Sequence, residues 1–282
     1  MKYIFVNLKR FDVPAEMGGV NRLSPPDKWA QAIMPEICKG LKRYLTDGDS
    51  KDRVLFTFFF PEAHIIQAVG AIGDFPVSIG CQSVHWDDIT KSGNFGAFTS
   101  SRPAAAMNAL GCSSVIIGHC EERRVLAAML AEGGVESETA ASAANSLLGK
   151  KITAAMARNL AVLYCVGEKA EEQEHWKEVL SAQLQALPSA THGTLVIGYE
   201  PVWAIGPGKT PPDRAYIEKV ARFIKEKTNL PIVYGGGLKS DNAEMLKSIP
   251  EIDGGLIALT RFSGEIGFYP AEYLEIVDLY LS

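Results

Sequence analysis

One carboxylate stands where an apolar run of strand length ends. Val196 to Tyr199 form the end of that run, Glu200 follows, and Pro201 comes next. Proline cannot donate to a sheet ladder, so the strand is expected to stop at the carboxylate. The next residues, 202–210, are largely apolar and close with Gly206-Pro207-Gly208, which suits a hinged lid that excludes water. Desolvation under a lid raises the pKa of a carboxyl group, so Glu200 is a candidate general base.

Two other interpretations fit this stretch. A glutamate at a strand end is often a solvated surface group or a partner in helix capping. The run from Gly206 to Thr210 also ends like a nucleotide phosphate loop, but that motif needs a glycine five residues before its Gly-Lys-Thr end. Trp203 occupies that position, which excludes the nucleotide loop and leaves the base and the surface group open.

A histidine follows another apolar run. His119 comes directly after 114–118 and precedes a helical pattern. Free backbone N–H groups and the positive end of that helix should hold its imidazole neutral, and a neutral imidazole N–H can polarise a carbonyl group. His119, Cys120 and Glu121 are metal-ligating residue types, but three consecutive positions cannot converge on one ion. We therefore predict no metal here.

A lysine closes the first apolar run. The chain reads Asn7-Leu8-Lys9 where that run ends. An unpaired ammonium group at the mouth of a barrel is costly to desolvate, and an anionic ligand there lowers the cost. Taken alone, Lys9 fits an anion site and an ordinary surface loop equally well.

These residues belong to a regular alternation of apolar runs and helical patterns along the chain. Short apolar runs recur along the chain, each followed by a polar turn and then by helical periodicity. The expected strands are Tyr3–Leu8, Val54–Phe60, Phe75–Gly80, Ser114–Gly118, Ala161–Val166, Thr194–Tyr199, Pro231–Tyr234 and Gly255–Leu259. Eight strand-helix units in 282 residues favour a closed (β/α)8 barrel, a TIM barrel, as one α/β domain spanning 1–282. Function in such a barrel lies at the carboxyl ends of the strands, where the residues above stand.

Helix signals support this alternation. Pro25-Pro26-Asp27 opens a helix over 28–44 that ends before Asp47-Gly48, and Pro211-Pro212-Asp213 opens another over 214–227. Ser240 is expected to cap a helix that runs to Lys247. The Ala-rich segment 124–158, interrupted by Gly133-Gly134 and Gly149, should hold two helices.

Composition excludes several classes of protein. Apolar residues make up 47% and charged residues 22%, which is ordinary for a globular chain, and the net charge is only −5. No basic patch interleaved with aromatics is present, so nucleic acid is not expected as a partner. No apolar run is long enough to span a membrane, and the N-terminus does not read as a signal peptide. The five cysteines are widely spaced and fit a reducing compartment, so we expect a cytoplasmic protein.

Over essentially its whole length the sequence resembles the triosephosphate isomerase family. The resemblance is strongest at the lid with its glutamate. The matching segments are Asn7-Leu-Lys9, Gly96-Ala-Phe-Thr99, Val115-Ile-Ile-Gly-His-Cys-Glu-Glu-Arg-Arg124, Tyr164-Cys-Val-Gly-Glu168, Tyr199-Glu-Pro-Val-Trp-Ala-Ile-Gly-Pro-Gly-Lys-Thr210, Tyr234-Gly-Gly236 and Ile252-Asp-Gly254.

The resemblance implies an aldose–ketose isomerase of a small phosphorylated sugar that needs no cofactor. Glu200 would move a proton between adjacent carbons through an enediolate, and the pairing of a glutamate base with a neutral histidine is carried over from this family itself. His119 and Asn7 would donate hydrogen bonds to the substrate oxygens, and Lys9 would supply positive charge. Either Glu121 or the additional Glu122 would orient Lys9, and the spacing from His119 favours Glu121.

The resemblance also implies a homodimer. In the family, the loop that matches Gly96 to Thr99 reaches the active site of the neighbouring subunit. Its threonine, retained here as Thr99, touches the asparagine and the lysine of the first strand. The glutamate expected near Ser101 is missing, so the interface is expected to differ in detail.

The sequence departs from the family at the phosphate end. Phosphate would be held by backbone N–H groups near Gly206 and near Gly236 and Gly237 after the seventh strand. After the eighth strand, the usual Gly-Gly pair is replaced within the run Ile257-Ala-Leu-Thr-Arg261. Side chains there should displace an anion, and Arg261 could replace the lost contacts as a bidentate ligand.

These departures affect the choice of substrate more than the choice of reaction. Triosephosphate isomerase activity is the leading expectation. The alternatives are an isomerase of a four-carbon ketose phosphate and a non-catalytic phosphosugar-binding relative.

Overall fold

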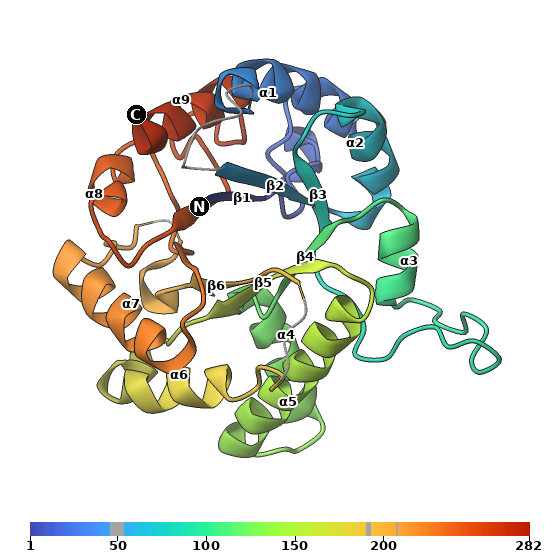
Figure 1. Ribbon diagram of the computed structural model, residues 1–282, viewed down its shortest axis with the longest axis vertical. Coiled ribbons are helices and arrows are strands. Elements are labelled where there is room, and N and C mark those ends of the chain that lie inside the picture. Colours follow the sequence, from blue (N-terminus) through green and yellow to red (C-terminus); the bar gives the residue numbers. More distant parts are fainter. Residues whose placement is uncertain (46–53, 190–192, 207) are drawn as a thin grey trace.

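The computed structural model describes residues 1–45, 54–189, 193–206 and 208–282, and shows a closed barrel of parallel strands. Each strand pairs with the next in sequence, and β1 closes the ring against β8. The strands are β1 (Lys2–Asn7), β2 (Val54–Phe60), β3 (Ser78–Cys81), β4 (Ser114–Ile117), β5 (Ala161–Val166), β6 (Leu195–Tyr199), β7 (Ile232–Tyr234) and β8 (Gly254–Ile257). Figure 1 looks into this ring, with the helices around it.

The helices form the outer layer of the barrel. They are α1 (Trp29–Leu45), α2 (Ile65–Ile72), α3 (Ala104–Ala109), α4 (Cys120–Glu132), α5 (Ser137–Met156), α6 (Trp176–Leu184), α7 (Arg214–Thr228), α8 (Ala243–Lys247) and α9 (Pro270–Leu281). Short 3-10 turns lie at Ala15–Met17, Pro26–Lys28, Glu62–His64, Ala170–His175 and Val202–Ala204. No helix in the described ranges is long and apolar enough to cross a membrane.

Two apolar clusters explain why the strands read as nearly continuous apolar runs. Ile4 and Val6 point outward and join a large cluster with helix residues such as Trp29 and Ile33. The alternate positions point inward and form a second cluster made only of strand residues: Tyr3, Phe5, Phe59, Ile116, Leu163, Cys165, Val196, Val233 and Leu256. Side chains on both faces of each strand are therefore buried, as expected when helices cover a parallel sheet.

The predicted fold class is confirmed, with small shifts at the strand ends. The largest shift is at β3, which begins at Ser78 and not at Phe75. The Phe75 and Val77 N–H groups bond to the carbonyls of Ile72 and Phe75 in a turn, so these residues do not join the ladder.

The helix predictions were confirmed in part. Two helices, α4 and α5, occupy the segment after His119 and separate at Gly133-Gly134, whereas Gly149 lies inside α5. Close packing explains that glycine, because an added Cβ would lie 2.4 Å from the Ala186 carbonyl oxygen. The predicted stop at Asp47-Gly48 lies outside the described residues. The Ser240 cap was wrong: α8 begins later, after Asn242, whose side chain bonds to Gly237 and Lys239.

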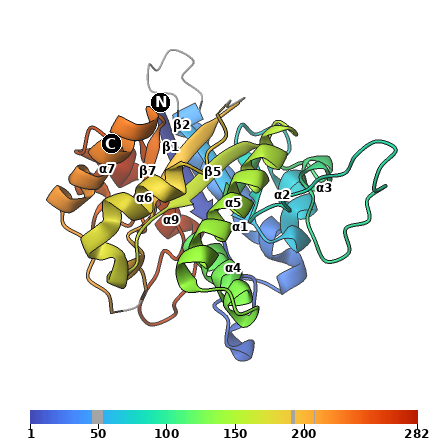
Figure 2. The same ribbon diagram turned by 90° about the horizontal axis from the view of Figure 1, so that it is seen from below.

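Two long connections extend from the barrel. The segment 11–24 after β1 projects at one end, shown in dark blue in Figure 2, and the loop 82–103 between β3 and α3 projects sideways. Both follow the carboxyl ends of strands, where active sites of this fold lie.

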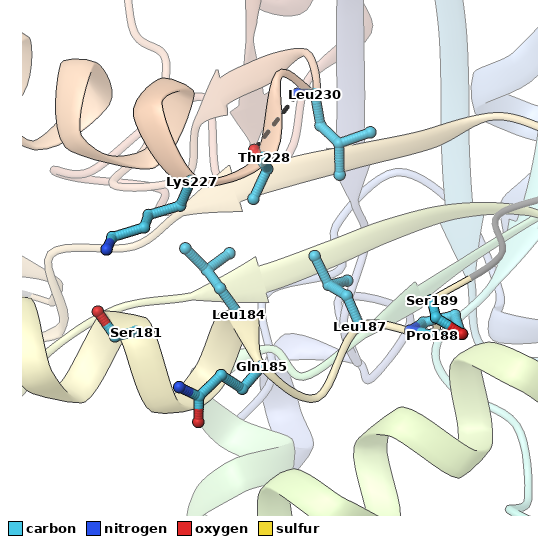
Figure 3. Close-up of a pocket in the computed structure, with 9 residues that line it drawn as sticks. All are labelled: Ser181, Leu184, Gln185, Leu187, Pro188, Ser189, Lys227, Thr228 and Leu230. Carbon is cyan, nitrogen blue, oxygen red and sulfur yellow. Dashed lines mark hydrogen bonds between the residues drawn. The ribbon is translucent and has the colours of Figure 1, made fainter.

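A cavity of about 420 Å³ lies at the other end of the barrel (Figure 3). It is lined by the ends of α6 and α7 and the turns that follow them, including Leu184 and Lys227, and those turns lead into the amino ends of β6 and β7. This places the cavity away from the predicted site.

Close packing between β8 and β1 gives a first prediction. A Cβ at Gly254 would lie 1.8 Å from the Tyr3 carbonyl oxygen, so Gly254→Ala should lower the free energy of unfolding by about 1–3 kcal/mol through overpacking. Gly70→Ala is the matched control, because Gly70 lies inside α2 with no atom within 4 Å of its added Cβ. The control should raise stability by about 0.5–1 kcal/mol. Urea unfolding measures both, and equal effects would contradict the strand packing.

Candidate active site

The predicted base lies buried at the carboxyl end of β6. Glu200 is only 1% exposed, and its Oε2 accepts a hydrogen bond from the Cys120 backbone N–H at 2.9 Å. Its Oε1 lies 3.1 Å from Nε2 of His119. This oxygen accepts no well-aligned hydrogen bond from the described residues. Burial raises the pKa of Glu200, although His119, the Cys120 N–H and Lys9 act in the opposite direction. The carboxylate is thus a stronger base than one in water.

The predicted electrophile caps the helix that follows β4. His119 is the N-cap of α4, and its Nδ1 accepts a hydrogen bond from the Glu121 backbone N–H at 3.2 Å. A nitrogen that accepts this bond carries no proton, so the ring proton of a neutral imidazole must lie on Nε2. That nitrogen faces Glu200, so it can donate to a substrate oxygen held beside the carboxylate.

Lys9 reaches the same region from β1. Its Nζ lies 2.8 Å from Glu121 Oε1, and its backbone has a φ of 41°, in the left-handed region that non-glycine residues rarely adopt. Asn7 helps to hold this turn, because its Oδ1 accepts bonds from the Lys9 backbone N–H and from Gln82 Nε2. These bonds leave the donor end of the Asn7 amide unused by either partner.

The two adjacent glutamates divide the supporting roles. Glu121 pairs with Lys9, as the sequence favoured. Glu122 instead accepts a bond from the Gly118 backbone N–H at 2.7 Å and contacts Ser83 and Lys151. Glu122 therefore connects the start of α4 to the segment that follows β3 and to α5.

Arg123 fixes the same helix start from its other side. Its guanidinium donates to the carbonyls of Gly118 and Cys165, to Asn145 in α5 and to the hydroxyl of Tyr164. The helix pair from 120 to 156 thus contributes Asn145 and Lys151 to the support of His119.

The segment 202–210, which the sequence predicts to be a lid, contacts a second buried carboxylate near its start. Oε1 of Glu168 accepts bonds from Trp203 Nε1 at 2.7 Å, from the Tyr199 hydroxyl at 3.0 Å and from the Tyr216 hydroxyl at 3.1 Å. Burial raises the pKa of Glu168 in spite of these donors. At the far end of the lid, Gly206 and Gly208 have φ of 119° and 74°, whereas Pro207 lies outside the described residues.

The predicted phosphate end is built from separate turns. Gly236 and Gly237 follow β7, and the backbone of Gly237 has a φ of 99°. Arg261 follows β8 and is already paired: its Nε donates to Glu272 Oε1 at 2.7 Å, and its guanidinium lies 4.0 Å from the ring centroid of Tyr269. A phosphate group would have to compete with Glu272 for Arg261.

Thr99 lies exposed on the projecting loop between β3 and α3 (Figure 1). The same loop carries Phe95, whose 84% exposure is unusual for a phenylalanine. Both residues belong to a segment that extends away from the barrel and not toward its own mouth.

His119, Cys120 and Glu200 place three metal-ligating atoms within 4.8 Å of one another. The thiol faces Nδ1 of the imidazole at 3.8 Å, whereas Glu200 faces Nε2 at 3.1 Å. The two groups thus approach opposite nitrogens, and burial raises the pKa of Cys120 to about 12. The prediction of no metal at this site therefore stands as a prediction.

Comparison with solved structures supports the barrel. The chain superposes over its full length on 99% of triosephosphate isomerase from Bartonella henselae, with a TM-score of 0.71 and 24% sequence identity. At that identity the likeness shows the fold alone.

Comparison of sequences shows the family. The model of the family described as triosephosphate isomerase matches residues 32–265. The chain belongs to the triosephosphate isomerase family. It is 32% identical over 246 residues to triosephosphate isomerase of Rhodopirellula baltica, covering 81% of this chain and 88% of the relative. It is 36% identical over 202 residues to that of Geobacter metallireducens, covering 66% and 72%. Membership of this family makes the chain an isomerase.

Sequence reasoning missed two supporting residues of this family site. Gln82 directly follows β3, so the rule that selects strand ends could have found it; its Nε2 bonds to Asn7 and to the carbonyls of Lys9 and Phe59. Glu168 lay within a matched motif, but its bond to Trp203 joins segments that no spacing rule connects.

The buried base gives a prediction about stability. Because burial holds the pKa of Glu200 above its ordinary value of 4.5, the folded chain binds this proton more tightly than the unfolded chain does. The resulting stabilisation is fully present below pH 4.5 and is lost as the pH rises through the folded-state pKa. Glu200→Gln should therefore become increasingly more stable than the wild type as the pH rises, measured by urea unfolding.

The matched control is Glu226→Gln on the exposed face of α7, which should stay within about 0.5 kcal/mol of the wild type. If the gain from Glu200→Gln were independent of pH, or shrank as the pH rose, the burial of an ionisable carboxyl group would be contradicted.

Proposed function

We propose that this chain interconverts the aldose and ketose forms of a small phosphorylated sugar, with dihydroxyacetone phosphate and glyceraldehyde 3-phosphate as the leading pair. The observation that carries the proposal is the 3.1 Å approach of Glu200 Oε1 to His119 Nε2 at the carboxyl ends of the strands. Lys9 supplies a cation at the same end, held by Glu121. Moving a proton between carbons needs a base, a donor for the developing oxyanion and exclusion of water.

The proton moves in two steps. Glu200 takes a proton from the carbon beside the carbonyl group, while Nε2–H of His119 donates to the carbonyl oxygen and stabilises the enediolate. A proton is then exchanged between the two oxygens, and Glu200 returns its proton to the neighbouring carbon. Lys9 and the Asn7 amide stabilise the negative charge, because fixed donors in a low-dielectric site act more strongly than water. No electrons or groups are gained or lost overall.

The base must change its position for this chemistry. In the structure, Glu200 Oε2 bonds to the Cys120 backbone N–H at the start of α4. The carboxylate has to leave this donor to reach a substrate carbon. We infer that the lid covers the site during this step, with Trp203 and its bond to Glu168 at the base of the lid and the glycines Gly206 and Gly208 at the other end.

A four-carbon ketose phosphate is the second candidate substrate. It is favoured by the turn after β8, where Ala258 and Leu259 replace a glycine pair and Arg261 is engaged by Glu272. A turn of different shape at the end of the site that receives the phosphate would suit a sugar longer than the usual triose.

We further propose a homodimer in the cytoplasm. The projecting loop that carries Thr99 and the exposed Phe95 suits insertion into a second copy, where Thr99 would contact Asn7 and Lys9. Family membership supports this assembly.

Solvent exchange tests the reaction. In heavy water, turnover should place deuterium on the carbon beside the carbonyl group, and Glu200→Gln should slow this exchange by about 10²–10⁴-fold, because a positioned general base typically contributes that much. Nuclear magnetic resonance of the substrate measures the exchange, with dihydroxyacetone phosphate and a four-carbon ketose phosphate tested in parallel.

Glu226→Gln is again the matched control and should exchange at the wild-type rate. Faster exchange with the four-carbon substrate would select the second candidate. If neither compound exchanged, the isomerase proposal would give way to a phosphosugar-binding role.

A further inference from the structure

The turn after β7 is held in one shape by a single asparagine. Asn242 Oδ1 accepts a bond from the Lys239 backbone N–H at 2.9 Å, and its Nδ2 donates to the Gly237 carbonyl at 2.9 Å. The Leu238 backbone N–H bonds to the Leu256 carbonyl in β8 at 3.0 Å. The turn therefore has a fixed backbone and a fixed position against the eighth strand.

The turn after β7 begins beside Glu200, the candidate base, and leads away from it. A Cβ added at Gly235 would lie 2.7 Å from Cγ of Glu200, so the first residue of the turn touches the candidate base. A Cβ added at Gly237 would lie 3.4 Å from Cε of Lys239. The end of the Lys239 side chain thus lies beside Gly237, one of the predicted phosphate-binding residues.

The ammonium group of Lys239 also contacts the turn after β8. Its Nζ lies 4.2 Å from the ring centroid of Phe262, which is 50% exposed. An exposed aromatic ring that holds a lysine over its face restricts where the charge can go. Lys239 therefore joins the two turns that border the predicted phosphate end.

Lys239 is better placed to receive an anion than Arg261 is. Arg261 is bonded to Glu272 and has Glu265 within 4.0 Å. Among the described residues, no carboxylate lies within 4.0 Å of the Lys239 ammonium group. An anion would not have to displace a carboxylate to reach Lys239.

We propose that Lys239 binds the phosphate group of the substrate directly, and that Phe262 positions its ammonium group beside the Gly237 backbone. The positive charge compensates for the poorer approach of a phosphate group to the turn after β8, where Ala258 and Leu259 carry side chains in place of a glycine pair. This assignment rests on the proposed function for the identity of the ligand, a phosphate monoester.

Binding of inorganic phosphate tests the assignment without turnover. Isothermal titration calorimetry on the full chain should show that Lys239→Met weakens phosphate binding by about 10- to 100-fold, the range expected for losing one hydrogen bond to a charged group. Lys239→Arg should keep most of the affinity, because it retains the charge. The matched control is Lys247→Met on the exposed face of α8, which should bind like the wild type.

The role of Phe262 in positioning the Lys239 ammonium group has to be distinguished from a role in packing alone. Phe262→Leu should weaken phosphate binding by about two- to fivefold, which is the strength of an exposed cation–π contact, whereas Phe262→Tyr should keep it. The Michaelis constant for the phosphorylated substrate should rise in Lys239→Met and should rise much less in Lys239→Arg, which keeps the charge.

Each result has a separate meaning. Wild-type affinity in Lys239→Met, or no phosphate binding by the wild type, would overturn the assignment. If Lys239→Met weakens phosphate binding but the wild type catalyses no solvent exchange, the role of Lys239 in binding phosphate stands and the isomerase proposal is refuted. If the wild type catalyses solvent exchange but Lys239→Met binds phosphate with wild-type affinity, the isomerase reaction stands and the role of Lys239 is refuted.

Discussion

The structure depends on burying the carboxylate of Glu200 next to the imidazole of His119. Taking Glu200 out of water is unfavourable, and the fold offsets this with the Cys120 backbone N–H and the approach of His119 Nε2. Both groups belong to the start of α4, so the position of this helix end determines the surroundings of the candidate base. The same helix end sets the proton of the imidazole on Nε2 through the Glu121 backbone N–H.

The segments around α4 are best understood as its supports. Glu122 and Arg123 bind the start of the helix to Ser83 after β3, to β5 and to α5, while Glu121 extends from it to Lys9. The second helix of the long segment, α5, supplies Lys151 and Asn145 to this network. The Lys151–Glu122 pair is largely buried, so removing one partner would leave an uncompensated charge beside the start of α4. The additional glutamate thus has a structural role distinct from that of Glu121.

Much of the fold was predictable because each strand is buried on both faces. That burial produces short apolar runs such as 54–60 and 161–166, which the structure reproduces residue for residue. That Glu200 and His119 would lie close together was predictable, because a barrel gathers the residues that follow its strands. Pairings between distant segments were not predictable, because side-chain contacts such as Arg261 with Glu272 follow from packing and not from spacing. The prediction of Ser240 as a cap was wrong for a related reason. The turn after β7 extends to Asn242, whose side chain bonds to Lys239 and Gly237, so α8 begins only after Asn242.

A structure with a phosphorylated analogue of the enediolate bound would test the central claim most directly. The account predicts that the analogue lies at the carboxyl ends of the strands, with Glu200 released from the Cys120 N–H and facing the two carbons. Nε2 of His119 should lie within hydrogen-bond distance of the oxygens, and Lys9 should stay beside them. An analogue bound elsewhere, or a Glu200 carboxylate that remains on the Cys120 N–H with the analogue in place, would contradict the account.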